Sequence, residues 1–289
     1  MIQIPIAALK KARTLLSRVR FAQCKLPALN CIRARADMTG LTLAVTDLDH
    51  WLETRVDLSA APTGPDAFLI PAAALNAAVK ADKGTEVRFH PRGRKNHREL
   101  RLVATCGGLE VETVFPSCDL TEFPERPIVD GTETLLPAST LEALQVVAPC
   151  ASTNAQRQIL NGVFFTPDRD SALDHGAGAG AGGMLIATDG KRLAGAPATV
   201  PERNFILSNP AVKVLSPAAF FNGDLTVTLP RDSEQRLVAF RAGDTLLVSR
   251  TIEGSYPNFR QVIPREQPHA VTIPDGRRAA VAKWLRSHK

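Results

Sequence analysis

Hydrophobic and polar residues alternate in short runs over most of the chain, and a helical pattern interrupts this alternation at two matching places. After Ile4-Pro5, apolar residues recur between Leu9 and Val19 at the spacing of one helix face. Leu136-Pro137, 132 residues further on, opens a second such pattern that runs from Ser139 to Val147. The sequence therefore predicts a helix near the start of each of two similar segments.

Other short motifs recur at nearly the same offset. Val45-Thr46-Asp47 returns as Ala187-Thr188-Asp189, and Phe123-Pro124 returns as Tyr256-Pro257. Each segment also carries a second helical pattern, over Pro71–Lys80 and Asn209–Phe220. A third opening, Ile273-Pro274, is followed by a helical pattern over Arg277–Arg286. Self-similarity at a fixed period is typical of tandem structural units.

The repeat predicts the domain organisation. We expect one domain over 1–130, a second over 131–268, and the first strand and helix of a shortened third unit over 269–289. Two helices among many short alternating strands predict an α+β fold in which the helices cover one face of antiparallel sheet.

Charge is segregated along the chain, whose net charge is +6. Residues 1–36 hold eight Lys and Arg and no acid, whereas residues 37–87 hold eight acids and three bases. Residues 88–101 are basic again, with Arg92–Arg98 expected at a hairpin tip, and 102–150 are acidic. Such bands indicate one basic surface and one acidic surface, and a basic surface suits a polyanion.

Several classes of protein are disfavoured by what the sequence lacks. The five cysteines are odd in number and form no C-x-x-C, which argues against a disulfide framework or a zinc site. No apolar run approaches the length of a membrane span, and Lys10 and Lys11 interrupt any signal peptide. We expect a cytoplasmic protein without membrane association, cofactor, metal or catalytic residues.

The most distinctive motif is a buried strand, Met184–Ala187, followed by the polar turn Thr188-Asp189-Gly190, where Gly190 is expected to take a positive φ. With the run Arg157–Phe165 before it and Glu253–Pro264 after it, this motif resembles the middle domain of the bacterial sliding DNA clamp, the beta subunit of DNA polymerase III. The segments Lys25–Asn30 and Leu41–Asp49 resemble the first domain of the same family.

The resemblance implies tandem domains of the DNA clamp fold, assembled as a homo-oligomeric ring that encircles double-stranded DNA and gives the polymerase its processivity. The implied partners are the DNA polymerase III alpha subunit, the clamp loader and repair polymerases, which carry clamp-binding motifs. Contact with sliding DNA has to be electrostatic and independent of sequence. The candidates for it are Lys10, Lys11, Arg18, Arg20, Lys25, Lys80, Lys83 and Arg157.

The resemblance also implies an apolar cleft on the middle domain that takes a short peptide. By motif position its lining is Leu160, Thr188, Gly190, Arg192, Leu193, Pro257 and Val262. The alternative is that Leu160, Leu193 and Val262 are ordinary core residues.

The sequence departs from the family pattern at Lys191, where the family commonly has His, at Gln261, where a second basic residue is common, and in the shortened third unit. Three chains of two domains would still supply six domains to a ring. A truncated clamp paralogue that binds partners without closing a ring is the alternative function. A metal-dependent nuclease built on Asp47, Asp49 and Asp189 is a weaker alternative, because a turn at each strand end also explains the repeated aspartate.

Overall fold

The computed structural model describes residues 1–19, 25–38, 40–58, 60–63, 67–92, 99–168, 182–215, 224–232, 234–263, 274–277, 280–281 and 283–284. They fall into two units, Met1–Tyr256 and Pro257–Lys289, and each unit is described by itself. Three features of the sequence lie largely outside the described residues: Arg20, the hairpin tip at 93–98, and most of the helix expected over Arg277–Arg286.

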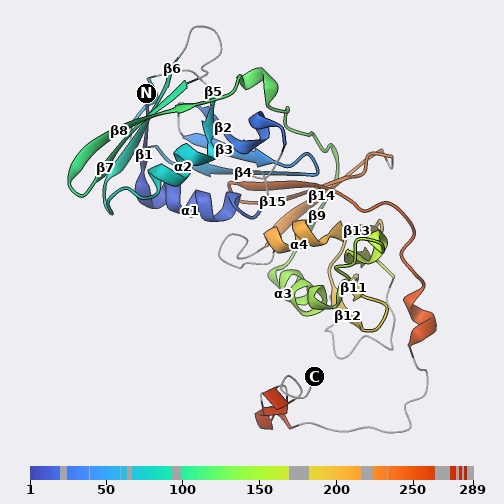
Figure 1. The fold of residues 1–289 in the computed structure, drawn as a ribbon. Coiled ribbons are helices and arrows are strands. Elements are labelled where there is room, and N and C mark those ends of the chain that lie inside the picture. The colour runs from blue at the N-terminus through green and yellow to red at the C-terminus, as the bar shows by residue number, and fades with distance from the viewer. Residues whose placement is uncertain are drawn as a thin grey trace. The chain divides into compact units, whose positions relative to one another are not determined.

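The first unit contains the same order of α-helices and strands twice, as the repeat in the sequence predicts (Figure 1). The first repeat comprises β1 (Ile2–Pro5), α1 (Ile6–Leu16), the 3-10 turn η2 (Pro27–Asn30), β2 (Cys31–Ala36), β3 (Leu41–Thr46), β4 (His50–Val56), β5 (Ala67–Pro71), α2 (Ala72–Ala78), β6 (Glu86–Arg92), β7 (Glu99–Cys106) and β8 (Leu109–Pro116).

A connecting segment with the 3-10 turn η3 (Leu120–Glu122) leads to the second repeat. That repeat comprises β9 (Gly131–Leu136), α3 (Ala138–Val147), the 3-10 turns η4 (Ala148–Cys150) and η5 (Gln158–Leu160), β10 (Gly162–Thr166), β11 (Gly183–Thr188), β12 (Leu193–Ala198), β13 (Phe205–Ser208), α4 (Asn209–Leu215), β14 (Leu225–Pro230), β15 (Leu237–Ala242) and β16 (Thr245–Arg250). The second unit contains the 3-10 turns η6 (Phe259–Val262) and η7 (Asp275–Arg277).

The strands that the structure describes form three antiparallel sheets. Two of them have four strands each, in the orders β1-β6-β7-β8 and β12-β11-β10-β13. The third has eight strands in the order β5-β2-β3-β4-β16-β15-β14-β9, so that four strands of each repeat join edge to edge. The join is the pair β4–β16, in which Leu52 lies opposite Leu247 and Trp51 opposite Val248. One continuous sheet therefore holds the two repeats together.

The helices begin where the sequence predicts. α1, α2 and α3 each start directly after a proline in extended conformation, Pro5, Pro71 and Pro137. Proline has no N–H to donate, so the position before the first helical turn suits it. α4 begins at Asn209 as expected and is described to Leu215.

The apolar faces of the helices pack on the sheets to form one continuous core. On α1 this face includes Leu9, Leu15 and Leu16, each at most 1% exposed. A smaller cluster covers the opposite face of the eight-stranded sheet, where Phe123 from the connecting segment packs edge-on against Trp51, with 5.8 Å between ring centroids. Helices on one side of antiparallel sheet make this an α+β fold.

Candidate functional site

The candidate peptide cleft centres on the turn between β11 and β12. The Thr188 hydroxyl donates to the carbonyl of Arg192 at 2.6 Å and accepts the Gly190 N–H at 3.1 Å. Asp189 Oδ1 accepts the N–H groups of Lys191 and Arg192, both at 2.8 Å. Gly190 has a φ of +85°, as predicted, and only glycine adopts this conformation without strain. The side chains therefore fix the turn in one shape.

An ion pair inside the turn fixes Arg192. Its Nε and Nη2 atoms donate to Asp189 Oδ2 at 3.1 and 2.9 Å, and Nη2 also lies 3.4 Å from the carbonyl of Pro149 in η4. The backbone N–H groups of Arg192 and Lys191, together with the Arg192 side chain, lower the pKa of Asp189 to about 2. The carboxylate therefore stays charged at neutral pH.

Arg157, the residue before η5, contacts this turn, and Leu193 begins β12 directly after it. Arg157 Nη1 donates to the carbonyl of Asp189 at 3.2 Å and lies 2.5 Å from the position that a Cβ on Gly190 would take. Leu160 and Leu193 are half-buried. Half-buried apolar side chains beside fixed polar groups can take an apolar peptide side chain and orient its backbone.

Pro257 and Val262, the remaining candidates for the cleft, belong to the second unit. Both are exposed, and Val262 is 71% exposed within η6. The last residue of the first unit, Tyr256, stacks on Phe164 of β10 with 4.7 Å between ring centroids and 4° between ring planes. Burial raises the pKa of Tyr256 to about 12. This stack fixes the end of the first unit on the sheet that also carries the turn.

The basic candidates for DNA contact lie mainly on or just after the helices of the first repeat. Lys11 on α1 and Lys80 and Lys83 after α2 are exposed, as is Lys25 before η2, whereas Lys10 and Arg18 are half-buried. Arg18 Nη1 donates to the carbonyl of Lys213 on α4 at 3.2 Å, and burial lowers the pKa of Arg18. Sequence reasoning missed Lys213, an exposed cation on the second helix of the second repeat.

His50 links the two repeats, and sequence reasoning did not single it out. Its Nδ1 lies 3.0 and 3.1 Å from the two carboxylate oxygens of Asp47, and its Nε2 lies 2.9 Å from Ser208 Oγ. Burial alone would raise the pKa of Asp47, but the hydrogen bonds and charge of His50 outweigh burial and lower it. His50 lies three residues after Asp47, as Arg192 lies three residues after Asp189, and Arg192 pairs with that aspartate. This matching position in the repeat could have pointed to His50 from the sequence.

The order Asp47–His50–Ser208 is that of a hydrolase triad, but the serine has a structural role here. Ser208 Oγ also accepts the N–H of Ala211 at 3.4 Å, so it caps α4 while it bonds to His50. A cavity of about 340 Å³ beside it is lined by groups that include Arg18, Asp47, His50 and Lys213.

Of the aspartates of the nuclease alternative, Asp47 and Asp189 each hold a turn of their own, and the Asp49 carboxylate lies 3.5 Å from Arg250 Nε. Asp47 Oδ1 accepts the N–H groups of Asp49 and His50 at 3.2 and 2.8 Å, as Asp189 does for Lys191 and Arg192. Within the part of the chain that the structure describes, no three His, Cys, Asp or Glu side chains are placed to hold a metal ion. In that same part, no helix is long and apolar enough to cross a membrane.

Comparison with known proteins identifies the family. No protein-family model matches the chain. The beta sliding clamp of Synechococcus elongatus is 30% identical over 275 residues, which cover 92% of this chain and 68% of that protein. The beta sliding clamp of Synechocystis is 28% identical over 287 residues and covers 92% of this chain and 69% of the relative. This chain belongs to the beta sliding clamp family.

Solved structures of sliding clamps share the fold. A sliding clamp (DNA polymerase III subunit beta) of Bartonella birtlesii bound to griselimycin superposes with a TM-score of 0.74 at 24% identity, over 91% of this chain and 68% of that one. The Helicobacter pylori beta clamp bound to a DNA ligase peptide gives 0.73 at 16% identity, over 92% and 70%. The predicted family and the predicted clamp fold are thus confirmed, while the assignments of DNA-binding and cleft residues stay predictions.

Proposed function

We propose that this chain is a non-catalytic sliding clamp that encircles duplex DNA as a homo-oligomeric ring and tethers its partners there. The observation that carries the proposal is the match to a beta sliding clamp over 92% of the chain. We assign residues 1–130 and 131–268 to two clamp domains and 269–289 to the start of a third.

The proposed contact with DNA is electrostatic. A ring that slides has to be held by the phosphate backbone, since base-edge contacts would fix it at one sequence. Exposed lysines on and after the helices of the first repeat supply suitable charges, and Lys213 adds one from the second repeat. Arg18 and Arg157 are less suited than the lysines, because each guanidinium donates to a backbone carbonyl.

The proposed contact with partners is the cleft around the turn Thr188–Leu193. The Helicobacter pylori relative binds a DNA ligase peptide, which supports a peptide-docking role in this family. We expect the DNA polymerase III alpha subunit, the clamp loader and repair polymerases to dock here through clamp-binding motifs, in the cytoplasm. Half-buried Leu160 and Leu193 would take apolar side chains of the motif.

The decisive test is whether binding depends on DNA topology. The chain would be incubated with a nicked circular plasmid at low salt and passed through a sizing column at high salt, which screens purely electrostatic contacts. We expect the protein to stay on the circle and to leave it when the plasmid is linearised. Equal retention on circular and linear DNA would contradict the ring and favour a partner-binding module.

A further inference from the structure

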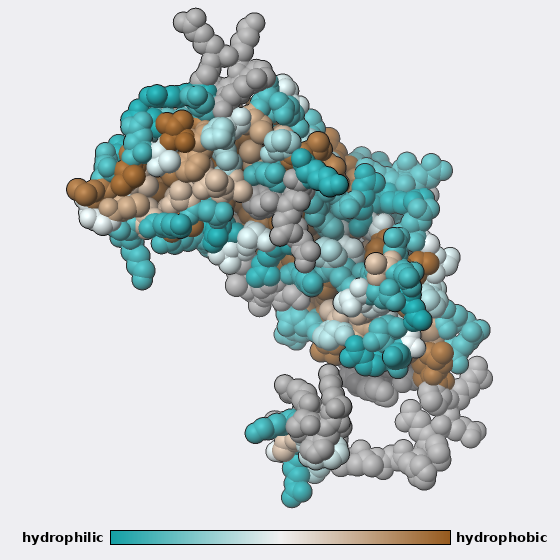
Figure 2. Space-filling model, viewed as in Figure 1, coloured by the Kyte–Doolittle hydropathy of each residue, from teal (hydrophilic) through white to brown (hydrophobic). Residues whose placement is uncertain are grey.

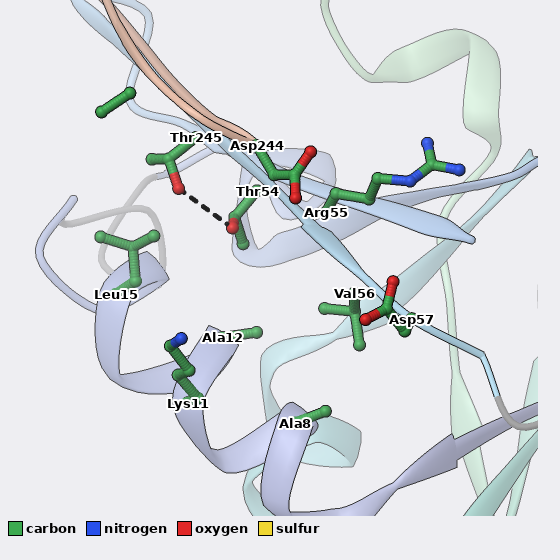
Figure 3. Close-up of a pocket in the computed structure, with 11 residues that line it drawn as sticks. Ala8, Lys11, Ala12, Leu15, Thr54, Arg55, Val56, Asp57, Asp244 and Thr245 are labelled. Carbon is green, nitrogen blue, oxygen red and sulfur yellow. Dashed lines mark hydrogen bonds between the residues drawn. The ribbon is translucent and has the colours of Figure 1, made fainter. Parts of the chain in front are cut away.

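The eight-stranded sheet is covered differently on its two faces. On the helix side, the join between the repeats leaves a cavity of about 360 Å³ beside α1, where the hydroxyl oxygens of Thr54 and Thr245 lie 3.2 Å apart (Figure 3). The other face carries the connecting segment 117–130, which follows β8 and contributes to the smaller core cluster. That cluster contains Cys31, and Cys118 packs against it. The face away from the helices therefore brings two thiols into one apolar environment.

Cys118 lies between two residues whose side chains fix the backbone around it. Before it, the Ser117 hydroxyl donates to the carbonyl of Leu69 in β5 at 3.1 Å. After it, Asp119 is buried, and its Oδ1 accepts the N–H and the hydroxyl of Thr121 at 3.0 and 2.9 Å, which caps η3. These contacts on both sides limit where the Cys118 side chain can go.

Cys31 meets Cys118 from the first position of β2. Cys31 is 3% exposed and lies opposite Pro71 of β5, the strand that Ser117 also contacts. Its sulfur lies 3.8 Å from the carbonyl oxygen of Pro27 and is hydrogen-bonded to both the thiol and the backbone N–H of Cys118. Two cysteines that are far apart in the sequence are therefore in direct contact.

The other cysteines that the structure describes lie in different places. Cys106 ends β7 opposite Leu109, in the part of the first unit where Figure 2 shows hydrophobic residues gathered at the surface. Cys150 ends η4 in the second repeat. Both are half-buried, as Cys118 is, so they are controls of matched exposure for it.

We propose that Cys31 and Cys118 are an oxidation site, at which a reversible disulfide ties the connecting segment to β2. A disulfide forms where two cysteine side chains already approach each other, and the contact between these two sulfurs meets that condition. In a reducing compartment such a bond is transient, since free thiols reopen it. One reversible bond does not amount to the disulfide framework against which the cysteine pattern argues.

The two thiols would react in a fixed order with a small disulfide such as oxidised glutathione. Cys118, the more exposed of the two, loses its proton and attacks one glutathione sulfur, and the other glutathione leaves and takes up that proton. Burial, with the Cys118 thiol and the Glu122 carboxylate nearby, raises the pKa of Cys31, so Cys31 stays protonated until the second step.

In the second step the Cys31 sulfur attacks the Cys118 sulfur, and the bond from Cys118 to glutathione breaks. The Cys31 proton passes to the departing glutathione. Two protein thiols are thereby oxidised to one disulfide, and one glutathione disulfide is reduced to two thiols. The direct contact between the two cysteines favours this step over attack by a thiol from solution.

Peptide mapping of the full chain tests the pairing. The protein would be incubated with oxidised glutathione, blocked with an alkylating reagent, denatured, and digested with trypsin and a glutamate-specific protease. Cleavage after Lys, Arg and Glu releases peptides 26–33 and 113–122, each with one cysteine. We expect these two peptides to be joined, and to separate on reduction. Recovery of both peptides unlinked would overturn the proposal.

Serine variants test the order of attack. In Cys31→Ser, we expect Cys118 to accumulate as a mixed disulfide with glutathione, whereas in Cys118→Ser we expect the buried Cys31 to stay unmodified. Cys106→Ser and Cys150→Ser are the controls, and both should keep the link between peptides 26–33 and 113–122. Circular dichroism checks that the variants fold. Equally fast modification of Cys31 and of Cys118 in the two variants would overturn the order.

Thermal unfolding tests the tie between the connecting segment and the sheet. Closing the long loop between the two cysteines restricts the unfolded chain, so we expect oxidation to raise the melting temperature by at least about 5 °C. The rise should be lost in Cys31→Ser and kept in Cys106→Ser. A linked chain that melts at the temperature of the reduced chain would overturn the tie. These measurements need no DNA or partner, so their failure would leave the proposed clamp function standing.

Discussion

The imidazole Nε2 of His50 lies 2.9 Å from the hydroxyl of Ser208, and this contact joins the first repeat to the second. His50 begins β4, which carries the sheet across the join, and Ser208 caps α4. Asp47 holds the other ring nitrogen. At the matching position in the second repeat, Arg192 is bonded to Asp189. In each repeat, therefore, the aspartate of the Thr-Asp turn bonds to the side chain three residues after it.

The first prediction concerns this contact. Ser208→Ala removes the partner of His50 Nε2 and the cap of the Ala211 N–H, and we expect the free energy of unfolding to fall by about 1–2 kcal/mol. Urea titration followed by circular dichroism measures it. Ser17→Ala, which removes an exposed hydroxyl that bonds within its own helix region, is the matched control, expected to change stability by less than about 0.5 kcal/mol. Equal losses for the two variants would contradict the role given to Ser208.

The stability of the turn around Asp189 should be sensitive to acid. The folded-state pKa of Asp189 is about 2, below the ordinary value of about 3.9, so its stabilising effect is complete above pH 4 and is lost as the pH falls toward 2. We expect Asp189→Ala to lower the melting temperature most near neutral pH, with the difference from wild type shrinking across that window. Asp130→Ala, which removes an exposed carboxylate in another part of the chain, is the control. A difference that stays constant down to pH 2 would count against the bonds assigned to Asp189.

Binding of partners should depend on Leu193. Leu193→Glu places a charge on a half-buried apolar residue of the proposed cleft, and we expect the affinity for a clamp-motif peptide to fall at least tenfold, or about 1.4 kcal/mol. Fluorescence anisotropy with a labelled peptide measures it, and Met38→Glu, at a residue 85% exposed in the first repeat, is the control. Unchanged affinity in a fold-competent variant would show that Leu193 lies outside the docking site.

The salt dependence of DNA binding should show whether Lys11 contacts a phosphate. If Lys11 neutralises one phosphate, Lys11→Ala should lower the slope of log K against log salt by about 0.9. A series of anisotropy titrations at increasing salt, with a labelled duplex, measures the slope. Arg231→Ala also removes one positive charge, from an exposed site directly after β14, and should leave the slope unchanged. Identical slopes for wild type and Lys11→Ala would remove this residue from the contact.

The sequence by itself determined the repeat, the positions of the helices and the Thr-Asp-Gly turn, because these depend on local periodicity, on prolines before helices and on residues within six positions of one another. α1 and α3 begin within a few residues of their predicted positions, and Gly190 has the positive φ expected of it. The family followed from the same local motifs in their order along the chain.

Only the tertiary structure decided which edges meet. The hydrophobic pattern of β4, β8, β12 and β16 marks each as a strand but carries no signal for its neighbour across the join, because a backbone ladder pairs any two edges of suitable length. The contacts of His50 with Ser208 and of Arg18 with Lys213 span 158 and 195 residues, distances at which no sequence periodicity acts. Side-chain packing between repeats, rather than local preference, set these partners.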